Sequence, residues 1–471
     1  MKQLNSLRVW LFVVLLLCFS LSGQAQFLRT SYFMEGSNQR MQLNPALMPG
    51  RGYLNIPVIG SLNATVNSSS LGYRDIMDII ENSDDSDYFM SNDFMNRLDA
   101  TNNLNVNLST DILSAGWYKG KNFWSVNVGL RNDIGAAIPK TMFQFMNNMS
   151  SREFGDNISD YLGINETING QKLEINSYAE VGLGFARNIT DRLAVGGKVK
   201  MLLGIGNLKL NINQIHVETP SVGSSGVTSK ASIQVDATLE NSSKLLELPE
   251  NENGDYIDEI DFGSLIDFGS FGFAGYGGAI DLGVSYKLLD KLTLSASVLD
   301  LGFIKWSKSN TSIARANTEQ TYDLLDPASQ QEFMDIVNSG EILNYDMLQL
   351  KTEEASEKSR TRGLTSTMVL GAEYALLNDW LVVGALYTGR FAKPKTLNEL
   401  TFSACIRPTN AFNVAASYSV LQGAGKTFGL ALKLGSFFAG TDYMFFGKNT
   451  KNVNAYLGVS IPLGKQKTAE N

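Results

Sequence analysis

The stretch from residue 402 to residue 462 alternates between apolar and polar or small side chains, and this alternation restricts the fold more than any other feature. In residues 452–462, Val453, Leu457 and Ile461 fall on one face, whereas Asn454 and Ser460 fall on the other. A period of two residues is typical of a β-strand. About ten residues of this kind match a strand that crosses a bilayer between lipid and a wet lumen. Similar segments recur along the chain, so we predict an all-β fold, a transmembrane antiparallel β-barrel.

About fourteen spanning strands are predicted, and the lengths of their connections indicate the topology. They are placed at residues 53–67, 103–118, 123–134, 172–187, 192–210, 273–287, 291–306, 361–376, 380–391, 399–407, 411–421, 426–435, 437–446 and 452–463. Short turns follow the even-numbered strands, and every long loop follows an odd-numbered one. Outer-membrane barrels have an even strand count, short periplasmic turns and long outside loops. We therefore expect both chain ends in the periplasm.

The long loops are expected to be partly helical and to lie on the extracellular side. Helical segments are predicted near residues 74–82, 88–98, 139–149 and 326–338. The segment at residues 230–240 alternates like a strand. We assign it to a hairpin inside a loop, because a fifteenth spanning strand would break the alternation of short and long connections.

The first 25 residues are predicted to be a secretory signal peptide. Lys2 and Arg8 precede an apolar core at residues 9–21, and small residues precede a cleavage site near Ala25. A lipoprotein cleaved before Cys18 is rejected, because such a site requires a small residue where the sequence has leucine. The remaining chain is divided into an N-terminal periplasmic or plug segment at 26–52, the barrel at 53–464 and a polar tail at 465–471. The expected location is the outer membrane of a Gram-negative cell.

Composition argues against several classes of function. The net charge of -8 argues against a nucleic-acid partner, since phosphate binding needs a basic surface. His216 is the single histidine, which argues against a histidine metal site or general base. The acidic stretches at 82–87 and 251–261 lack the spaced ligands of a calcium loop. We therefore expect a protein that is not an enzyme, with no cofactor and no metal site.

Ionisable residues fall on the predicted lumen face of the strands and are candidate functional residues. They are Glu180, Lys198, Lys200, Asp281, Glu373, Arg390, Arg407, Lys433 and Asp442. In a solvated channel such residues would tune selectivity, and in a filled barrel they would pair with one another. Both alternatives remain open, and we favour them over catalysis because the carboxylates lie on different strands.

Methionine and phenylalanine at helical spacing mark the first two long loops. Met90, Phe94, Met142 and Phe145 are candidates for contact with a hydrophobic solute. The alternative, which we favour, is that these loop helices pack on one another over the barrel mouth.

Aromatic residues are expected to form two belts at the membrane interfaces. One row, near the short turns, contains Trp117, Trp124, Tyr286, Tyr374, Trp380 and Phe412. The other contains Trp306, Tyr387, Phe391, Tyr418 and Phe445.

The N-terminal segment carries a family resemblance. Residues 32–37 and the run Leu43-Asn44-Pro45-Ala46-Leu47, taken with the leader and the barrel pattern, resemble an uncharacterised family of Bacteroidetes outer-membrane proteins. Asn44-Pro45-Ala46 is also similar to a motif of the fatty-acid transporter superfamily and its relatives in type IX secretion. That resemblance implies a 14-stranded barrel with an N-terminal plug. The last strand departs from many outer-membrane barrels, because it ends in Ile461-Pro462-Leu463-Gly464 and not in a terminal phenylalanine.

Two functions follow from these features. The leading hypothesis is a plugged outer-membrane channel or transporter for a small solute, with hydrophobic solutes included. The alternative is a structural or secretion-associated barrel that docks a protein partner on its extracellular loops. The expected partners are thus outer-membrane lipid and either a small hydrophobic solute or a secretion-system protein.

Overall fold

The computed structural model describes residues 28–56, 61–72, 74–75, 91–150, 157–221, 229–246, 248–251, 253–257, 272–339, 348–353, 359–377, 379–391, 396–421, 427–444 and 451–464. The predicted signal peptide, Met90 and the predicted tail at 465–471 lie outside the described residues, as does most of the predicted helix at 74–82. Within the described ranges, no helix combines the length and the apolar character needed to cross a membrane.

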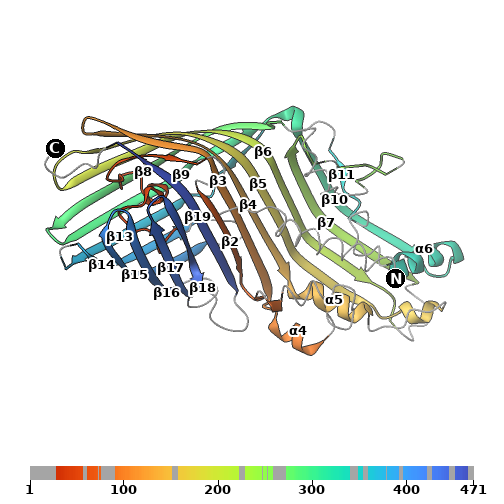
Figure 1. Cartoon of the computed structure of the whole chain (residues 1–471). Helices are drawn as coiled ribbons and strands as arrows, with labels where there is room; N and C mark the ends of the chain where they lie inside the picture. Colours follow the sequence, from red (N-terminus) through yellow and green to blue (C-terminus); the bar gives the residue numbers. More distant parts are fainter. Residues whose placement is uncertain are drawn as a thin grey trace.

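Fourteen antiparallel strands of the described chain close into a barrel, as predicted (Figure 1). In chain order they are β1 (Gly52–Asn55) continued by β2 (Leu62–Ser68), β3 (Thr101–Lys119), β4 (Asn122–Pro139), β5 (Asn165–Asn188), β6 (Leu193–Glu218), β8 (Gly275–Leu289), β9 (Leu292–Trp306), β12 (Arg360–Gly363) continued by β13 (Thr367–Leu376), β14 (Leu381–Arg390), β15 (Leu397–Thr409), β16 (Phe412–Leu421), β17 (Thr427–Leu434), β18 (Phe437–Met444) and β19 (Asn452–Leu463). β1 and β2 both pair with β3 on one side and with β19 on the other, which closes the barrel.

The two ends of the barrel differ in their connections. At one end, short turns join β3 to β4, β5 to β6, β8 to β9, β13 to β14, β15 to β16 and β17 to β18. We call this the turn end and the opposite one the loop end. The segregation of short and long connections follows the predicted parity.

Side-chain burial confirms the predicted faces of the barrel strands. In β19, Val453, Leu457 and Ile461 are 38–44 % exposed, whereas Asn454 and Tyr456 are at most 3 % exposed. The apolar face of the strand therefore points outward, and the polar face points into the barrel.

The aromatic row at the turn end is exposed, but one residue of the other row was assigned wrongly. Trp117, Tyr286 and Trp380 are 42–58 % exposed. Trp306 is fully buried, because its indole ring fills the space beside Gly204 and Gly275 on the inner face of the wall. Phe445 lies outside the described residues.

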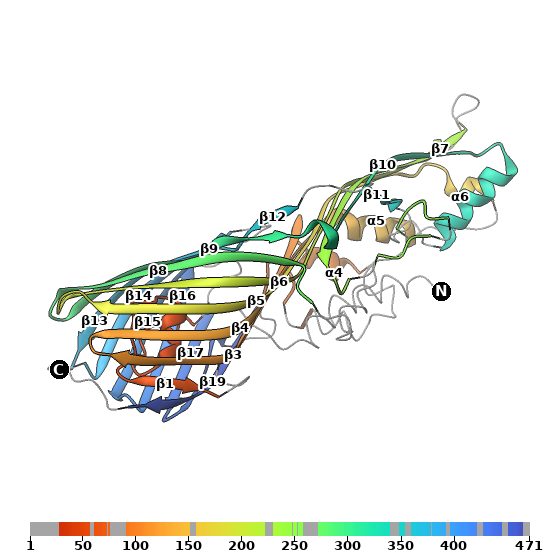
Figure 2. The ribbon, with the colours of Figure 1, turned by 90° about the horizontal axis from the view of Figure 1, so that it is seen from above.

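Several strands continue past the loop end and form an extension of the barrel (Figure 2). β6 has 26 residues, which corresponds to roughly 85 Å at about 3.3 Å per residue. A spanning strand needs only about 9–11 residues. In the extension, β7 (Lys230–Ser243) pairs with the outer half of β6 and with β10 (Thr311–Asp323), and β11 (Lys351–Thr352) pairs with β10.

The structure therefore places the predicted hairpin segment at 230–240 outside the barrel. It also adds a strand where the sequence predicts a loop and a helix over residues 307–360. That strand is β10, whose buried face carries Ala314 and Ala316. Alanine gives a weaker apolar alternation than the larger side chains on which the prediction relied.

The extension has an apolar core of its own. Helix α5 (Lys140–Ser150) contributes Phe145 and helix α6 (Pro327–Ser339) contributes Phe333, and both pack against the apolar face of β5, β6, β7 and β10. A smaller cluster joins Phe94 of helix α4 (Asn92–Arg97) to Phe143 of α5, with ring centroids 5.6 Å apart.

The helices cover a continuation of the outer face of the barrel. Trp124, Leu130, Ile134 and Ala136 all occupy even positions of β4, and the pairing of β4 with β5 has no register shift between them. Ile134 and Ala136 contact the core of the extension. The apolar outer face of β4 is thus uncovered within the barrel, whereas beyond the loop end it is covered by the core of the extension.

Replacement of Phe333 by alanine is expected to unfold the extension without opening the barrel. The Phe333 ring is fully buried, 5.4 Å from the Tyr322 ring, and such a truncation costs about 3–5 kcal/mol. Limited proteolysis should cut the variant within the extension, while heat-modifiable gel mobility stays unchanged. Loss of heat-modifiable mobility would contradict an independent core.

Acid is expected to loosen the junction between the barrel and the extension. Glu240 of β7 lies 2.9 Å from Arg360 and 3.6 Å from Lys209, and it also pairs with Arg362. Burial opposes ionisation of this carboxyl, but the cations outweigh burial and hold the pKa of Glu240 below its ordinary value of 4.5. The ion pairs of Glu240 therefore stabilise the junction fully above pH 4.5. This stabilisation is lost as the pH falls through the lowered pKa of Glu240. Hydrogen exchange in β7 should rise at acidic pH in the native protein. An equal response in Glu240→Gln would contradict this assignment.

Candidate functional site

The N-terminal segment at residues 28–50 lies inside the barrel and acts as a plug. Its apolar side chains pack against the inner face of β13–β18. The plug contributes Leu28, Tyr32, Phe33, Met34, Leu43 and Leu47, and the wall contributes, among others, Val369, Val382, Leu386, Cys405, Ala415 and Ala431. The wall residues are mostly small or of medium size, so the larger side chains of the plug fill the space that they leave.

A buried arginine anchors the start of the plug. Arg29 is fully buried and forms ion pairs with Glu399 of β15 and with Asp442 of β18. The backbone N–H groups of Arg29 and Thr30 donate hydrogen bonds to the Asp442 carboxylate at 3.2 and 2.8 Å. The Arg29 guanidinium also lies 4.9 Å from the centre of the Tyr443 ring. The plug therefore supplies the Asp442 carboxylate with hydrogen-bond donors and with a positive charge.

A second ionic group holds the plug nearer to the turn end. Arg407 of β15 lies 2.9 Å from Glu373 of β13, 3.5 Å from Glu35 of the plug, and donates a hydrogen bond to the Phe33 carbonyl. Arg40 of the plug lies 3.7 Å from the same Glu373. Arg407 and Glu373 of the wall thus contact each other and also contact the plug.

The Asn44-Pro45-Ala46 motif rests on a pair of glycines in the opposite wall. Asn44 Nδ2 donates hydrogen bonds to the carbonyls of Val284 and Ala296, and its Oδ1 accepts one from the Ala46 N–H at 2.9 Å. Gly196 of β6 and Gly283 of β8 are direct cross-strand partners. A Cβ atom at either glycine would collide with the motif. The motif therefore fits because the wall lacks side chains at this point.

Replacement of Gly196 by valine is expected to unseat the plug. Any side chain there would overlap the Pro45 carbonyl, and the colliding atoms are backbone, which cannot move aside like a flexible side chain. We expect faster proteolysis within residues 28–50 and unchanged heat-modifiable mobility of the barrel. Gly206→Val is the matched control, because a Cβ there meets only Ser243. Equal protection of the plug in both variants would contradict the proposed seat.

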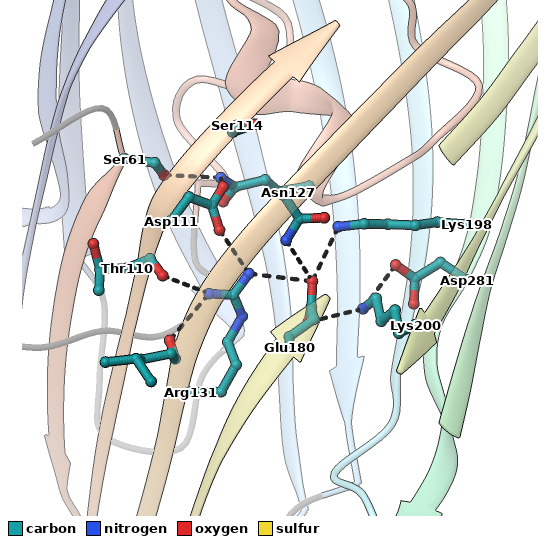
Figure 3. A network of polar contacts seen from close by, with 12 residues as sticks. Ser61, Thr110, Asp111, Ser114, Asn127, Arg131, Glu180, Lys198, Lys200 and Asp281 are labelled. Carbon is teal, nitrogen blue, oxygen red and sulfur yellow. Dashed lines mark hydrogen bonds and ion pairs between the residues drawn. The ribbon is translucent and has the colours of Figure 1, made fainter. Parts of the chain in front are cut away.

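A network of charged residues lies on the inner face of β3, β4, β5, β6 and β8 (Figure 3). Lys200 of β6 is at its centre and lies 2.5 Å from Asp300, 2.8 Å from Asp281 and 3.7 Å from Glu180. Glu180 of β5 in turn contacts Lys198 at 3.1 Å and Arg131 at 3.4 Å. Lys200 is therefore surrounded by three carboxylates, and the side chains of the network point toward one another across neighbouring strands.

Two further contacts extend this network toward the plug. Arg131 of β4 lies 2.8 Å from Asp111 of β3, and Gln42 of the plug donates a hydrogen bond to the same carboxylate at 3.2 Å. Between Gln42 and Lys198 lies a small polar cavity of about 40 Å³, which is room for a water or two. This cavity is therefore too small for a sugar or an amino acid.

The nine predicted lumen residues lie on the inner face of the barrel, in different surroundings. Glu180, Lys198, Lys200 and Asp281 belong to the charged network, and Glu373, Arg407 and Asp442 contact the plug. Arg390 contacts Asn107 and Asp133 nearer to the loop end, and Lys433 donates hydrogen bonds to the carbonyls of Asn410 and Gly435.

The described loop candidates lie in the cores of the extension. Phe94 packs on Phe143, Phe145 is 1 % exposed, and Met142 contacts the main core. Among the described residues, no group of three or more His, Cys, Asp or Glu side chains could hold a metal ion.

Several charged residues of the site were missed by sequence reasoning, among them Arg29, Arg40, Asp111, Arg131, Asp300 and Glu399. Arg131 lies on the predicted lumen face of β4, so the alternation could have found it. Asp300 could not be found in this way, because β9 has a register shift opposite Asp281 and Asp300 itself has a φ of 58°.

A protein-family model matches residues 45–442, which is most of the chain. It describes a family of unknown function, DUF5723. The chain belongs to this family. Within this DUF5723 protein, the match begins in the Asn44-Pro45-Ala46 motif and ends at Asp442, so it includes part of the plug and nearly all of the barrel. No curated protein matches the sequence.

Several solved structures are similar to this DUF5723 protein at low sequence identity. The toluene transporter TbuX of Ralstonia pickettii has a TM-score of 0.42 and 9 % identity, with 95 % of this chain and 100 % of that chain covered. A FadL homologue of Pseudomonas aeruginosa has a TM-score of 0.38 and 10 % identity, with coverages of 90 % and 93 %. The toluene transporter TodX of Pseudomonas putida has a TM-score of 0.34 and 8 % identity, with coverages of 90 % and 92 %. These likenesses are too weak to carry a conclusion about this chain.

Proposed function

We propose that this DUF5723 protein is an outer-membrane channel or transporter for a small solute, closed at rest by its own N-terminal segment. The plug is the observation that carries the proposal. Side chains fill the interior of a barrel of about eight strands, whereas wider barrels leave a lumen. Here the lumen is filled by a separate segment that belongs to no barrel strand. It is held by ion pairs and hydrogen bonds, which water can replace, and by apolar packing against β13–β18. Because the barrel strands pair with one another without this segment, the plug can be displaced without unfolding the barrel.

The outer face of the barrel supports a location in the outer membrane. Leu183, Val199 and Leu282 are among its exposed apolar side chains, and each is more than half exposed. In a membrane, a closed barrel satisfies every backbone polar group without an open edge, and bacterial barrels of this type belong to the outer membrane. The predicted signal peptide would direct the chain there.

The inner face favours a small polar solute over a hydrophobic one. Its buried positions include the amides of Asn63, Asn105 and Asn454 and the hydroxyls of Thr65 and Ser417. These groups both donate and accept hydrogen bonds. The described loop candidates for contact with a hydrophobic solute, Phe94, Met142 and Phe145, are packed inside the extension. Hydrophobic solutes therefore remain the second choice.

Uptake into proteoliposomes tests the proposal. The full chain and the Gly196→Val variant are reconstituted, and swelling is measured with small sugars and amino acids alongside uptake of a hydrophobic dye. We expect greater uptake of the polar solutes through the variant than through the Gly206→Val control. No uptake by either variant, with the plug of Gly196→Val shown to be released, would overturn the channel proposal.

A second function is favoured by the extension, whose apolar core exists independently of the lumen. A barrel that anchors such a folded unit could present it to a protein partner, including a component of a secretion system. A protein that co-purifies in stoichiometric amount and is lost in Phe333→Ala, combined with no solute uptake, would support this function over transport.

A further inference from the structure

Basic side chains are concentrated on one part of the turn end. Three turns carry them, and each turn has two cations: Lys119 and Lys121 in β3–β4, Arg187 and Arg192 in β5–β6, and Lys287 and Lys291 in β8–β9. All six are exposed. The same turns contain two acidic residues, Asp191 and Asp290, so the local charge is positive although the chain as a whole carries -8.

These three turns are neighbours around the barrel and form one surface, which we call the basic rim. Arg187 is the cross-strand partner of Asn122, next to Lys121. The Lys287 N–H donates a hydrogen bond to the Arg192 carbonyl at 2.7 Å. In the described part of the other short turns, the β13–β14 turn contains Asp379, and β15–β16 and β17–β18 contain no exposed cation. Among the short turns that the structure describes, exposed positive charge is therefore confined to one side of the turn end.

Apolar side chains lie beside the cations at the tips of two of these turns, β5–β6 and β8–β9. Ile189, Leu288 and Leu289 are 42–57 % exposed, and Trp117 and Tyr286 lie exposed just behind them. Apolar tips are unfavourable in bulk water but favourable at the boundary between acyl chains and headgroups. A lysine or arginine in this setting extends its charged end into the headgroup layer. The tips thus indicate that the rim lies within the membrane interface and not beyond it.

We infer that the basic rim binds the phosphate groups of anionic phospholipids in the leaflet at the turn end. In the orientation proposed above, this is the periplasmic leaflet. Six cations over three adjacent turns create a local positive potential that attracts anionic headgroups. The barrel is then surrounded asymmetrically, with anionic lipid enriched beside β3–β9 and not beside β13–β18. This inference does not depend on whether the lumen conducts a solute.

Tryptophan fluorescence provides the test, because the chain has an exposed indole on each side of the turn end. Trp117 lies in the rim and Trp380 lies in the β13–β14 turn, at 44 % and 58 % exposure. Two double variants isolate these reporters. One double variant retains Trp117 and carries Trp124→Phe and Trp380→Phe. The other retains Trp380 and carries Trp117→Phe and Trp124→Phe. Trp306 is fully buried and common to both, and Trp10 lies in the predicted signal peptide.

Each reporter is placed in phosphatidylcholine vesicles that contain a small fraction of brominated lipid, either phosphatidylglycerol or phosphatidylcholine. We expect brominated phosphatidylglycerol to quench Trp117 more strongly than brominated phosphatidylcholine does, and the two lipids to quench Trp380 equally. The excess at Trp117 should fall as salt is added, because salt screens charges at an exposed surface.

Charge removal completes the design. Neutralising Lys119, Lys121, Arg187, Lys287 and Lys291 to glutamine should abolish the excess quenching. Neutralising Lys172, Lys230 and Lys351, which are exposed on the extension, should leave it unchanged. Heat-modifiable mobility verifies that each variant is folded, and the salt titration of the unneutralised reporter decides the question if the rim variant does not fold.

Equal quenching of Trp117 by the two lipids would overturn the inference, as would an equal excess at Trp380. Equal quenching combined with binding of cell-wall fragments that depends on the rim cations would assign the rim to an anionic polymer of the periplasm and overturn the lipid assignment.

Discussion

Deletion of residues 28–48 is expected to convert the closed barrel into an open pore, with polar solutes entering proteoliposomes freely. The deletion removes the larger side chains that fill the lumen together with Arg29 and Arg40. The wall carboxylates Glu399, Asp442 and Glu373 lose plug cations, but water entering the lumen can solvate them. The barrel strands are untouched, since β1 starts at Gly52. Single-channel conductance and liposome swelling measure the effect.

The deletion needs controls, because the plug also packs against β13–β18. Heat-modifiable mobility must show that the shortened chain still forms a barrel. Addition of a peptide with the sequence of residues 28–48 should reduce the conductance again. A folded barrel without its plug that still excludes small sugars would show that the lumen is closed by other residues, and the plug would then have no gating role.

Replacement of Lys200 by methionine is expected to destabilise the barrel by about 3–5 kcal/mol, because removing one partner leaves buried charges uncompensated. Lys200 and its neighbours Asp281 and Asp300 have side chains at most 8 % exposed. Without the ammonium group, these two carboxylates face each other and Glu180 at short range. Urea-induced unfolding of the reconstituted barrel, followed by gel mobility, measures the loss.

Lys198→Met is the matched control for this experiment. Lys198 is 18 % exposed on its side chain and contacts Glu180 alone in the network, and Glu180 keeps Arg131 and Asn127 as partners. Its replacement should therefore cost much less. Combining Lys200→Met with Asp281→Asn and Asp300→Asn should restore part of the stability. An equal cost for both lysine variants would show that the network does not act through charge compensation at Lys200.

The barrel could be predicted from the sequence because lipid and lumen impose opposite demands on alternate residues. This physical rule predicts that Glu180 and Lys200 point inward. The rule fails where the alternation is shifted. Asp300 lies at such a shift in β9 and was missed, although it makes the shortest contact of Lys200.

The contents of the lumen could be predicted only in outline. The Asn44-Pro45-Ala46 motif and the apolar residues around it indicated a plug, but no periodicity connects Arg29 with Glu399 and Asp442. The sequence pattern also predicts too few strands in the extension. Its core draws on β7 and β10, which belong to different long loops, and the buried face of β10 contains alanines that resemble a solvated loop in sequence.

The ion pair between Arg29 and Asp442 has a consequence for the order in which the protein is made. The two residues are separated by 413 positions, so the plug is synthesised long before its carboxylate partners. Contacts of such high sequence separation form late in folding. The first strand, β1–β2, is also the one that meets β19 to close the ring. Seating of the plug and closure of the ring thus wait for the same last strands, so the plug is seated as the ring closes.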